Sequence, residues 1–122
     1  MSLEVVGTAS VPEPGIAPTE SLPHPERHEI DLAAVLHALS DPMRLRIVFE
    51  LAADRGERSC KSFDLPIVKS TCTHHFKVLR EAGVIRQRVV GTKRVNSLRR
   101  QDLEARFPGL LGAVLAGSST DQ

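Results

Sequence analysis

The hydrophobic and polar residues of the chain follow a helical period in four stretches and a strand period in two. Apolar residues recur three and four positions apart over residues 29–39, 42–53, 69–82 and 101–116, which is the spacing of one face of an α-helix. Residues 84–90 and 93–98 alternate closer to every second position around Gly91-Thr92, as in a β-hairpin. The pattern predicts a mainly α fold with one two-stranded β-hairpin.

The stretch 69–82 separates its side chains into two clear faces. As a helix it places Cys72, Phe76 and Leu79 on one side, and Gly83 follows where a helix end adopts left-handed dihedrals. The other side carries short polar and cationic groups, which suit a DNA major groove because Ser, Thr and His reach base edges while Lys meets phosphates. We therefore predict that this helix contacts DNA through Lys69, Ser70, Thr71, Thr73, His74 and Lys77.

Local signals place the ends of the other helices. Ser40 and Asp41 are N-cap candidates ahead of Pro42, so a helix is expected over residues 42–53, and Ser70 or Thr71 is the expected cap of the helix at 69–82. Residues 59–65 have few apolar residues at helical spacing, so a short or distorted helix is expected there. Pro108 is expected to kink or restart the last helix.

The two ends of the chain lack any regular period. Residues 1–28 hold five prolines among polar residues, and neither a helix nor a strand continues through that spacing. We predict a disordered acidic, proline-rich arm over residues 1–28, one folded domain over 29–117 and a disordered tail over 118–122.

Charge is distributed very unevenly along the chain. Residues 42–100 hold fourteen Lys and Arg against five acids, a net +9, whereas residues 1–41 carry −6 and residues 101–122 carry −2. A basic middle suits docking on a polyanion, although a solvated surface of helical Lys and Arg is the plain alternative. In the hairpin, the cations expected to grip the DNA backbone are Arg86, Arg88, Lys93 and Arg94.

Three motifs together resemble the ArsR/SmtB family of winged helix-turn-helix transcriptional repressors. They are LSDPMRLRIV at 39–48, THHFKVLREAGVI at 73–85 and RQRVVGTKR at 86–94, and the likeness covers roughly residues 30–116. The resemblance implies a winged helix-turn-helix fold with the hairpin as its wing. It also implies a dimer that binds double-stranded DNA at an inverted-repeat operator and releases it when an effector binds.

Two apolar segments have more hydrophobic surface than one small domain can cover. Residues 29–39 are apolar nearly all round, and residues 101–116 carry a strongly apolar stripe. Association of two copies would bury both, as in the family's dimers. The expected homodimer contacts are Leu32, Val35, Leu36, Phe107, Leu110, Leu111, Val114 and Leu115.

The metal sites that the family resemblance implies are incomplete in this sequence. Cys60 lacks the second cysteine of a Cys-x-Cys pair, and the last segment has no histidine. A tetrahedral site needs about four donors, and a divalent metal ion would have to draw together His24, His28, His37 and Cys60. The alternatives are solvated histidines, an inert thiol, and control by a small molecule, redox chemistry or a partner protein.

No constellation of catalytic residues stands out, so the protein is not expected to be an enzyme. Cys72 lies on an apolar face, which disfavours a nucleophilic pair with His75, and His75 is expected to be half-buried and bonded to a backbone carbonyl. The absence of a signal sequence and of a membrane-spanning apolar run predicts a cytoplasmic protein. The predicted function is transcription regulation as a sequence-specific repressor; the alternative is a winged-helix protein-interaction module with weak or non-specific DNA binding.

Overall fold

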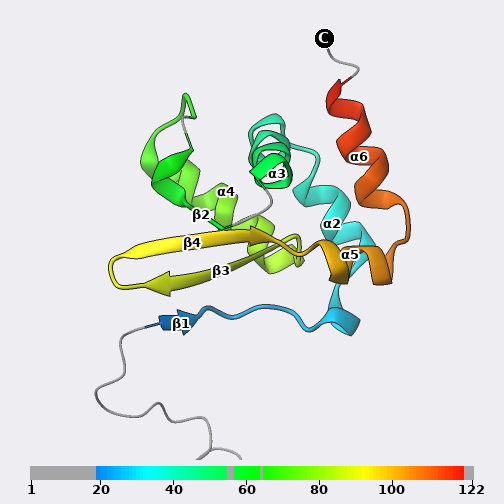
Figure 1. Cartoon of the computed structure of the whole chain (residues 1–122), viewed down its shortest axis with the longest axis horizontal. Coiled ribbons are helices and arrows are strands. Elements are labelled where there is room, and N and C mark those ends of the chain that lie inside the picture. Colours follow the sequence, from blue (N-terminus) through cyan, green and yellow to red (C-terminus); the bar gives the residue numbers. More distant parts are fainter. Residues whose placement is uncertain (1–18, 55–56, 64, 120–122) are drawn as a thin grey trace, which may run out of the picture.

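The computed structural model describes residues 19–54, 57–63 and 65–119. Figure 1 shows helices gathered around an antiparallel sheet whose longest part is a hairpin. The helices are α2 (Leu32–Ala38), α3 (Pro42–Asp54), α4 (Lys69–Ala82), α5 (Arg100–Arg106) and α6 (Leu110–Ser119), with 3-10 turns η1 (Arg27–Glu29) and η2 (Cys60–Ser62). The strands are β1 (Thr19–Ser21), β2 (Arg58–Ser59), β3 (Ile85–Val90) and β4 (Lys93–Leu98). The predicted mainly α architecture with a hairpin is confirmed.

The hairpin forms where the sequence predicts it. Strands β3 and β4 pair from Ile85↔Leu98 to Val90↔Lys93, and Gly91 at the turn has φ 64°. The sheet has the order β1-β3-β4-β2, so each outer edge of the hairpin carries a further short strand. We call this hairpin the wing, with its tip at Gly91-Thr92 and its root at the other end.

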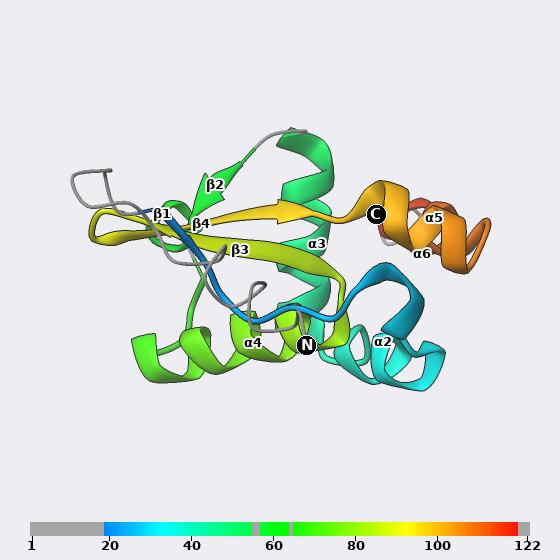
Figure 2. The ribbon, with the colours of Figure 1, turned by 90° about the horizontal axis from the view of Figure 1, so that it is seen from below.

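The N-terminal segment is more ordered than the sequence predicts. Strand β1 pairs antiparallel with β3 from Thr19↔Val90 to Ser21↔Arg88, and the chain then runs along the sheet to α2 (Figure 2). Residues 19–28, which we call the strap, therefore contain a strand and the start of a 3-10 turn where a disordered arm was expected. The three-residue strand of the strap lies between Pro18 and Pro23, so no proline interrupts the pairing. Residues 1–18 lie outside the described residues.

Three helix boundaries differ from, or refine, the predicted ones. Helix α2 begins at Leu32, because the Asp31 carboxylate accepts the N–H of Ala34 at 3.1 Å and ends the preceding irregular segment. Helix α4 has Val68 at its N-cap and no side-chain cap, so the expected capping by Ser70 or Thr71 is wrong. Helix α6 extends to Ser119, which places residues 118 and 119 in a helix where a tail was expected; residues 120–122 lie outside the described part.

The first helix of the helix-turn-helix is replaced by a single 3-10 turn, in line with the expected distortion. Phe63 follows it and is 7% exposed, with its ring edge-on to Phe76 of α4 at 5.4 Å between centroids. The turn therefore still anchors α4. The last segment breaks between α5 and α6, where Pro108 lies and Gly109 has φ 89°.

One hydrophobic core joins α2, α3, α4, the sheet and α5. Its fully buried hydrophobic side chains are Ile30, Val35, Ala38, Ile47, Val48, Leu51, Phe76, Leu79, Val84, Ile85 and Leu103. Gly83 ends α4 with φ 89°, as the sequence predicts, and lies against Ile30. The described residues include no helix long and apolar enough to cross a bilayer.

Candidate nucleic-acid interface

Helix α4 presents the two faces that its sequence predicts. Phe76 and Leu79 are buried in the core and Cys72 is half-buried. All six predicted reading residues are exposed, namely Lys69, Ser70, Thr71, Thr73, His74 and Lys77, and the acidic Glu81 is exposed near the end of the helix. A continuous polar surface therefore runs along the helix.

A cationic groove connects the start of α4 with the wing tip. This cavity of about 320 Å³ is lined by Ser59, Cys60, Lys61, Lys69, Thr73, Phe76, Gln87, Thr92, Lys93 and Arg94. Four of these residues are cationic and none is acidic, so the lining carries a net +4. Lys61 was not predicted as a site residue; its position just ahead of the reading helix was the signal available in the sequence.

The four predicted wing cations separate into two pairs. Lys93 and Arg94 are exposed at the tip and line the groove. Arg88 instead binds the Glu57 carboxylate through two nitrogens at 2.7 and 3.0 Å, hydrogen bonds that raise the pKa of Arg88. Arg86 lies at the root, with Nη2 3.7 Å from the Asp102 carboxylate. The structure therefore brings only the tip pair to the groove.

A buried arginine connects α4 to the two helices beside it. Arg44 of α3 is 7% exposed and donates to the carbonyl oxygens of Ala38 at 2.7 Å and His37 at 3.3 Å, at the end of α2. Its Nη1 lies 3.1 Å from Nδ1 of His75 in α4. One side chain thus ties three helices together.

His75 is held as a neutral imidazole. Arginine has only donors, so Nδ1 accepts from Arg44 and the ring proton sits on Nε2, which lies 3.8 Å from the Asp41 carboxylate. Burial lowers the pKa of His75 and outweighs the opposing effect of the Asp41 carboxylate, and the Arg44 charge lowers the pKa further. The predicted bond to a backbone carbonyl is wrong because the Arg44 guanidinium occupies that side of the ring.

A buried polar network fastens the wing to α4. Arg80 donates to the Gln87 side-chain oxygen at 2.8 Å, and Gln87 donates to Asn96 at 2.8 Å across the hairpin. Gln87 and Asn96 are 1% and 0% exposed and face each other in the strand register. Sequence reasoning missed this pair, although two amides at inward positions of alternating strands were a signal.

The structure does not bring the four candidate metal ligands together. Nε2 of His24 accepts the backbone N–H of Gln87 at 2.9 Å, while His28 and His37 are exposed on separate elements. The Cys60 sulfur lies 3.3 Å from Nδ2 of Asn96. Across residues 19–54, 57–63 and 65–119 no group of three or more His, Cys, Asp or Glu side chains could hold a metal ion.

The candidate dimer contacts fall into three groups by exposure. Leu32 and Leu36 are 44% and 49% exposed on α2. Val35 and Leu111 are buried within the single chain, at 0% and 7%, so they belong to its own core and not to a contact surface. The remaining four are half-buried on the last two helical segments: Phe107, Leu110, Val114 and Leu115.

An exposed polar helix beside a paired, cationic hairpin is the arrangement of a winged helix-turn-helix DNA-binding module. No protein-family model matches the chain. Two curated relatives do. The chain is 38% identical over 81 residues to the uncharacterized HTH-type transcriptional regulator YceK of Bacillus subtilis (strain 168), covering 65% of this chain and 81% of that protein. It is 36% identical over 61 residues to the uncharacterized HTH-type transcriptional regulator MJ1325 of Methanocaldococcus jannaschii, covering 49% and 68%.

A solved structure extends the comparison to the fold. The crystal structure of an ArsR family transcriptional regulator superimposes with a TM-score of 0.52 and 25% identity, covering 73% of this chain and 87% of that one. The chain belongs to the ArsR/SmtB family of winged helix-turn-helix transcriptional regulators. It is therefore a transcriptional regulator, and DNA is the partner that this class of protein implies.

Proposed function

We propose that the protein is a homodimeric repressor that binds an inverted-repeat operator and leaves it when an effector binds. The proposed DNA contact rests on the cationic groove, which continues the exposed face of α4 onto the wing tip. No acidic residue lines this groove. A polyanion that follows α4 meets positive charge on both sides of the helix start.

The polar side chains and the cations of this surface have different roles in the proposed DNA recognition. Short hydrogen-bonding side chains on α4 read base edges, where each well-placed contact contributes about 1–3 kcal/mol of discrimination. These are Ser70, Thr71, Thr73 and His74. The cations position the helix on phosphates without reading sequence. In this role we place Lys61, Lys69, Lys77, Lys93 and Arg94.

The homodimer follows from the exposed leucines of α2 and the half-buried apolar residues of α6. A two-fold axis through these segments gives two copies of α4 that enter the major groove about 34–36 Å apart. An inverted-repeat operator matches that symmetry. Leu32 and Leu36 are the best-exposed members of this surface.

The test is operator binding by the full chain, measured by fluorescence anisotropy against DNA from upstream of its own gene with non-specific competitor present. Combining His74→Ala with Lys77→Ala should weaken binding at least tenfold while the protein remains folded. His28→Ala, which removes an exposed histidine outside α4, is the matched control. Unchanged affinity of the double variant at moderate salt contradicts the assignment of α4 as reading helix. Equal binding of operator and competitor favours the interaction module instead.

Salt dependence tests the phosphate contacts separately. Neutralising a phosphate releases condensed counterions, so the logarithm of affinity falls by about 0.9 per contact for each tenfold rise in salt. Lys69→Ala and Lys93→Ala should each lower that slope by about one per protomer and weaken all sequences alike. A slope that stays at the wild-type value places these lysines away from the DNA.

A further inference from the structure

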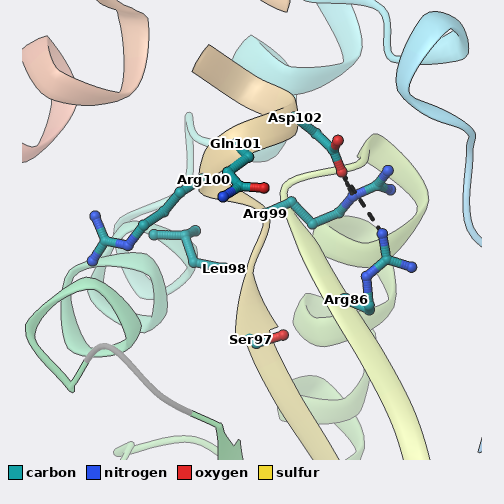
Figure 3. Close-up of a pocket in the computed structure, with 7 residues that line it drawn as sticks. All are labelled: Arg86, Ser97, Leu98, Arg99, Arg100, Gln101 and Asp102. Carbon is teal, nitrogen blue, oxygen red and sulfur yellow. Dashed lines mark hydrogen bonds and ion pairs between the residues drawn. The ribbon is translucent and has the colours of Figure 1, made fainter. Parts of the chain in front are cut away.

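A second charged site lies at the root of the wing. A cavity of about 420 Å³ there is lined by Arg86, Ser97, Leu98, Arg99, Arg100, Gln101 and Asp102 (Figure 3). It shares no lining residue with the cationic groove. Arg86 is four residues along β3 from Val90 at the tip, about 13 Å at roughly 3.3 Å per residue. The root cavity is therefore distinct from the surface proposed to hold DNA.

Positive charge exceeds negative charge in this cavity. Asp102 is the only acidic lining residue, and three guanidinium groups surround its carboxylate. The nitrogen-to-oxygen distances are 2.7 Å from Arg27, 2.8 Å from Arg99 and 3.7 Å from Arg86. Burial alone would raise the pKa of Asp102, but the hydrogen bonds from Arg27 and Arg99 outweigh it and lower that pKa. One ionised carboxylate leaves the lining with a net +2.

The donors in the cavity are partly fixed and partly unused. Arg99 is 6% exposed and held in place by its bonds to Asp102 and, at 2.9 Å, to the Pro25 carbonyl. Among the described residues, the Arg86 side chain has the 3.7 Å ion pair with Asp102 but no hydrogen bond, and the side chains of Ser97 and Gln101 have no hydrogen bond either. Figure 3 shows Arg86 and Arg99 converging on Asp102, while Arg100 extends the other way, toward the Ala52 carbonyl.

We propose that the root cavity binds a small molecule with two or more anionic groups, phosphate or carboxylate, and that this molecule is the effector. Planar guanidinium groups bind such oxyanions through two parallel hydrogen bonds, and the Arg86 side chain supplies such a group here. Arg99 adds its Nη2, since its Nε and Nη1 already bind Asp102 and Pro25. Gln101 and Ser97 add neutral donors. The volume lies within the usual range of about 300–1,000 Å³ for small-molecule sites. The effector role, though not the binding itself, rests on the proposed repressor function.

The same side chains connect the cavity to the strap and the wing. Asp102 holds Arg27 of the strap, Arg99 holds the Pro25 carbonyl, and β1 pairs with the edge of β3. An anion that draws Arg86 and Arg99 competes with Asp102 for them and changes its hold on Arg27. Occupancy of the cavity therefore acts on the edge of the wing that is proposed to contact DNA.

Calorimetric titration of the full chain at low ionic strength tests the site directly, without DNA. Inorganic pyrophosphate and citrate serve as separate probes, so the two titrations distinguish phosphate from carboxylate chemistry. We expect one bound probe per chain and an affinity at least tenfold lower for Arg86→Ala. Arg86→Lys should lose an intermediate amount of affinity, because it keeps the positive charge but not the planar guanidinium group. Arg94→Ala, an equal loss of charge at the wing tip, should change binding less than twofold.

Three results overturn the proposal. If neither pyrophosphate nor citrate binds the wild-type chain, the proposed anion site does not exist. If Arg94→Ala and Arg86→Ala lose equal affinity for the probe, the probe is attracted by the overall positive charge of the wing and not by the root cavity. Operator affinity that falls as much in Arg86→Ala as in Arg94→Ala assigns the cavity to a DNA phosphate. Because the titrations contain no DNA, failure of the repressor proposal leaves their outcome unaffected, and the probe's effect on operator affinity then tests the effector role alone.

Discussion

Arg44 and Asp41 give the LSDPMRLRIV segment its physical meaning at the scale of single residues. The Asp41 carboxylate accepts the N–H groups of Met43 and Arg44 at 2.9 and 3.1 Å and so caps α3, while the Arg44 side chain caps α2 and holds His75. Asp41 and Arg44, which lie within one helical turn, therefore contact the start of α3, the end of α2 and the side of α4. The segment therefore holds α4 in position against α2 and α3.

Gly83 provides a stability test with an internal control. An alanine there must adopt φ near 89°, which costs about 1–2 kcal/mol, and its Cβ would lie 2.7 Å from Cγ1 of Ile30. Gly109 has the same φ but open space around it, so Gly109→Ala incurs the backbone cost alone. Urea unfolding should show a larger loss for Gly83→Ala. Equal losses would mean that Ile30 moves aside without cost.

The buried imidazole of His75 predicts a pH dependence of stability. Burial lowers its pKa below the ordinary value of 6.5, so the unfolded chain binds the proton more readily than the folded one. Stability is full above about pH 6.5 and falls as the pH drops below it. His75→Asn, which keeps an acceptor near Nδ1, should lose less stability between pH 7.5 and pH 5.5 than wild type in urea titrations.

His28 is the control for that comparison, because its side chain is exposed. His28→Asn should retain the wild-type loss on acidification. His24 adds to the same slope, since burial also lowers its pKa. A wild-type slope in His75→Asn would assign the acid sensitivity to His24 and leave His75 without a role in it.

At the scale of elements, the strap and the wing form one unit. The strap is held by the pairing of β1 with β3, by His24 on the Gln87 N–H and by Arg99 on the Pro25 carbonyl. A three-residue strand has little stability of its own. The side-chain contacts therefore determine how firmly the strap covers the edge of the wing.

Amide hydrogen exchange measures that hold. His24→Ala removes the acceptor for the Gln87 N–H, and a net contribution of about 0.5–1.5 kcal/mol corresponds to roughly two- to tenfold faster exchange of that amide. Amides bonded between β3 and β4 serve as the internal control and should keep their rates. Faster exchange across the whole hairpin would show instead that the substitution loosens the wing itself.

Local signals account for the elements that the sequence predicts correctly. The wing turn, the two faces of α4 and the left-handed Gly83 each depend on a few neighbouring residues, so their positions are readable in order along the chain. Strand β1 is different. Nothing in Thr-Glu-Ser marks it as a strand, because it forms only where the edge of β3 is available.

The same limit applies to the candidate site. All six reading residues that the sequence predicted on α4 are exposed, since helical spacing alone determines that face. It could not distinguish the wing cations, because the partners of Arg88 and Arg86 are acids at positions 57 and 102, distant in the chain. Long-range ion pairs of this kind depend on the tertiary fold.

At the scale of the whole molecule, the cationic surface and the exposed apolar surface are separate. The cationic groove lies between the wing tip and the start of α4, whereas the exposed leucines of α2 and the apolar residues of α6 lie on other elements. The proposed DNA contact and the proposed dimer contact therefore use different residues, so neither blocks the other. This separation predicts that dimerisation can be removed without unfolding the protomer.

Leu36→Glu tests that prediction, because the side chain is 49% exposed and a carboxylate there is solvated in a monomer but buried in the proposed contact. Light scattering should report a dimer for wild type and a monomer for the variant, with unchanged helical circular dichroism. Val68→Glu makes the same chemical change at a 66% exposed residue outside the contact and should remain dimeric. The monomer loses operator affinity because each protomer then engages one half-site alone. A dimer that persists in Leu36→Glu would remove α2 from the interface.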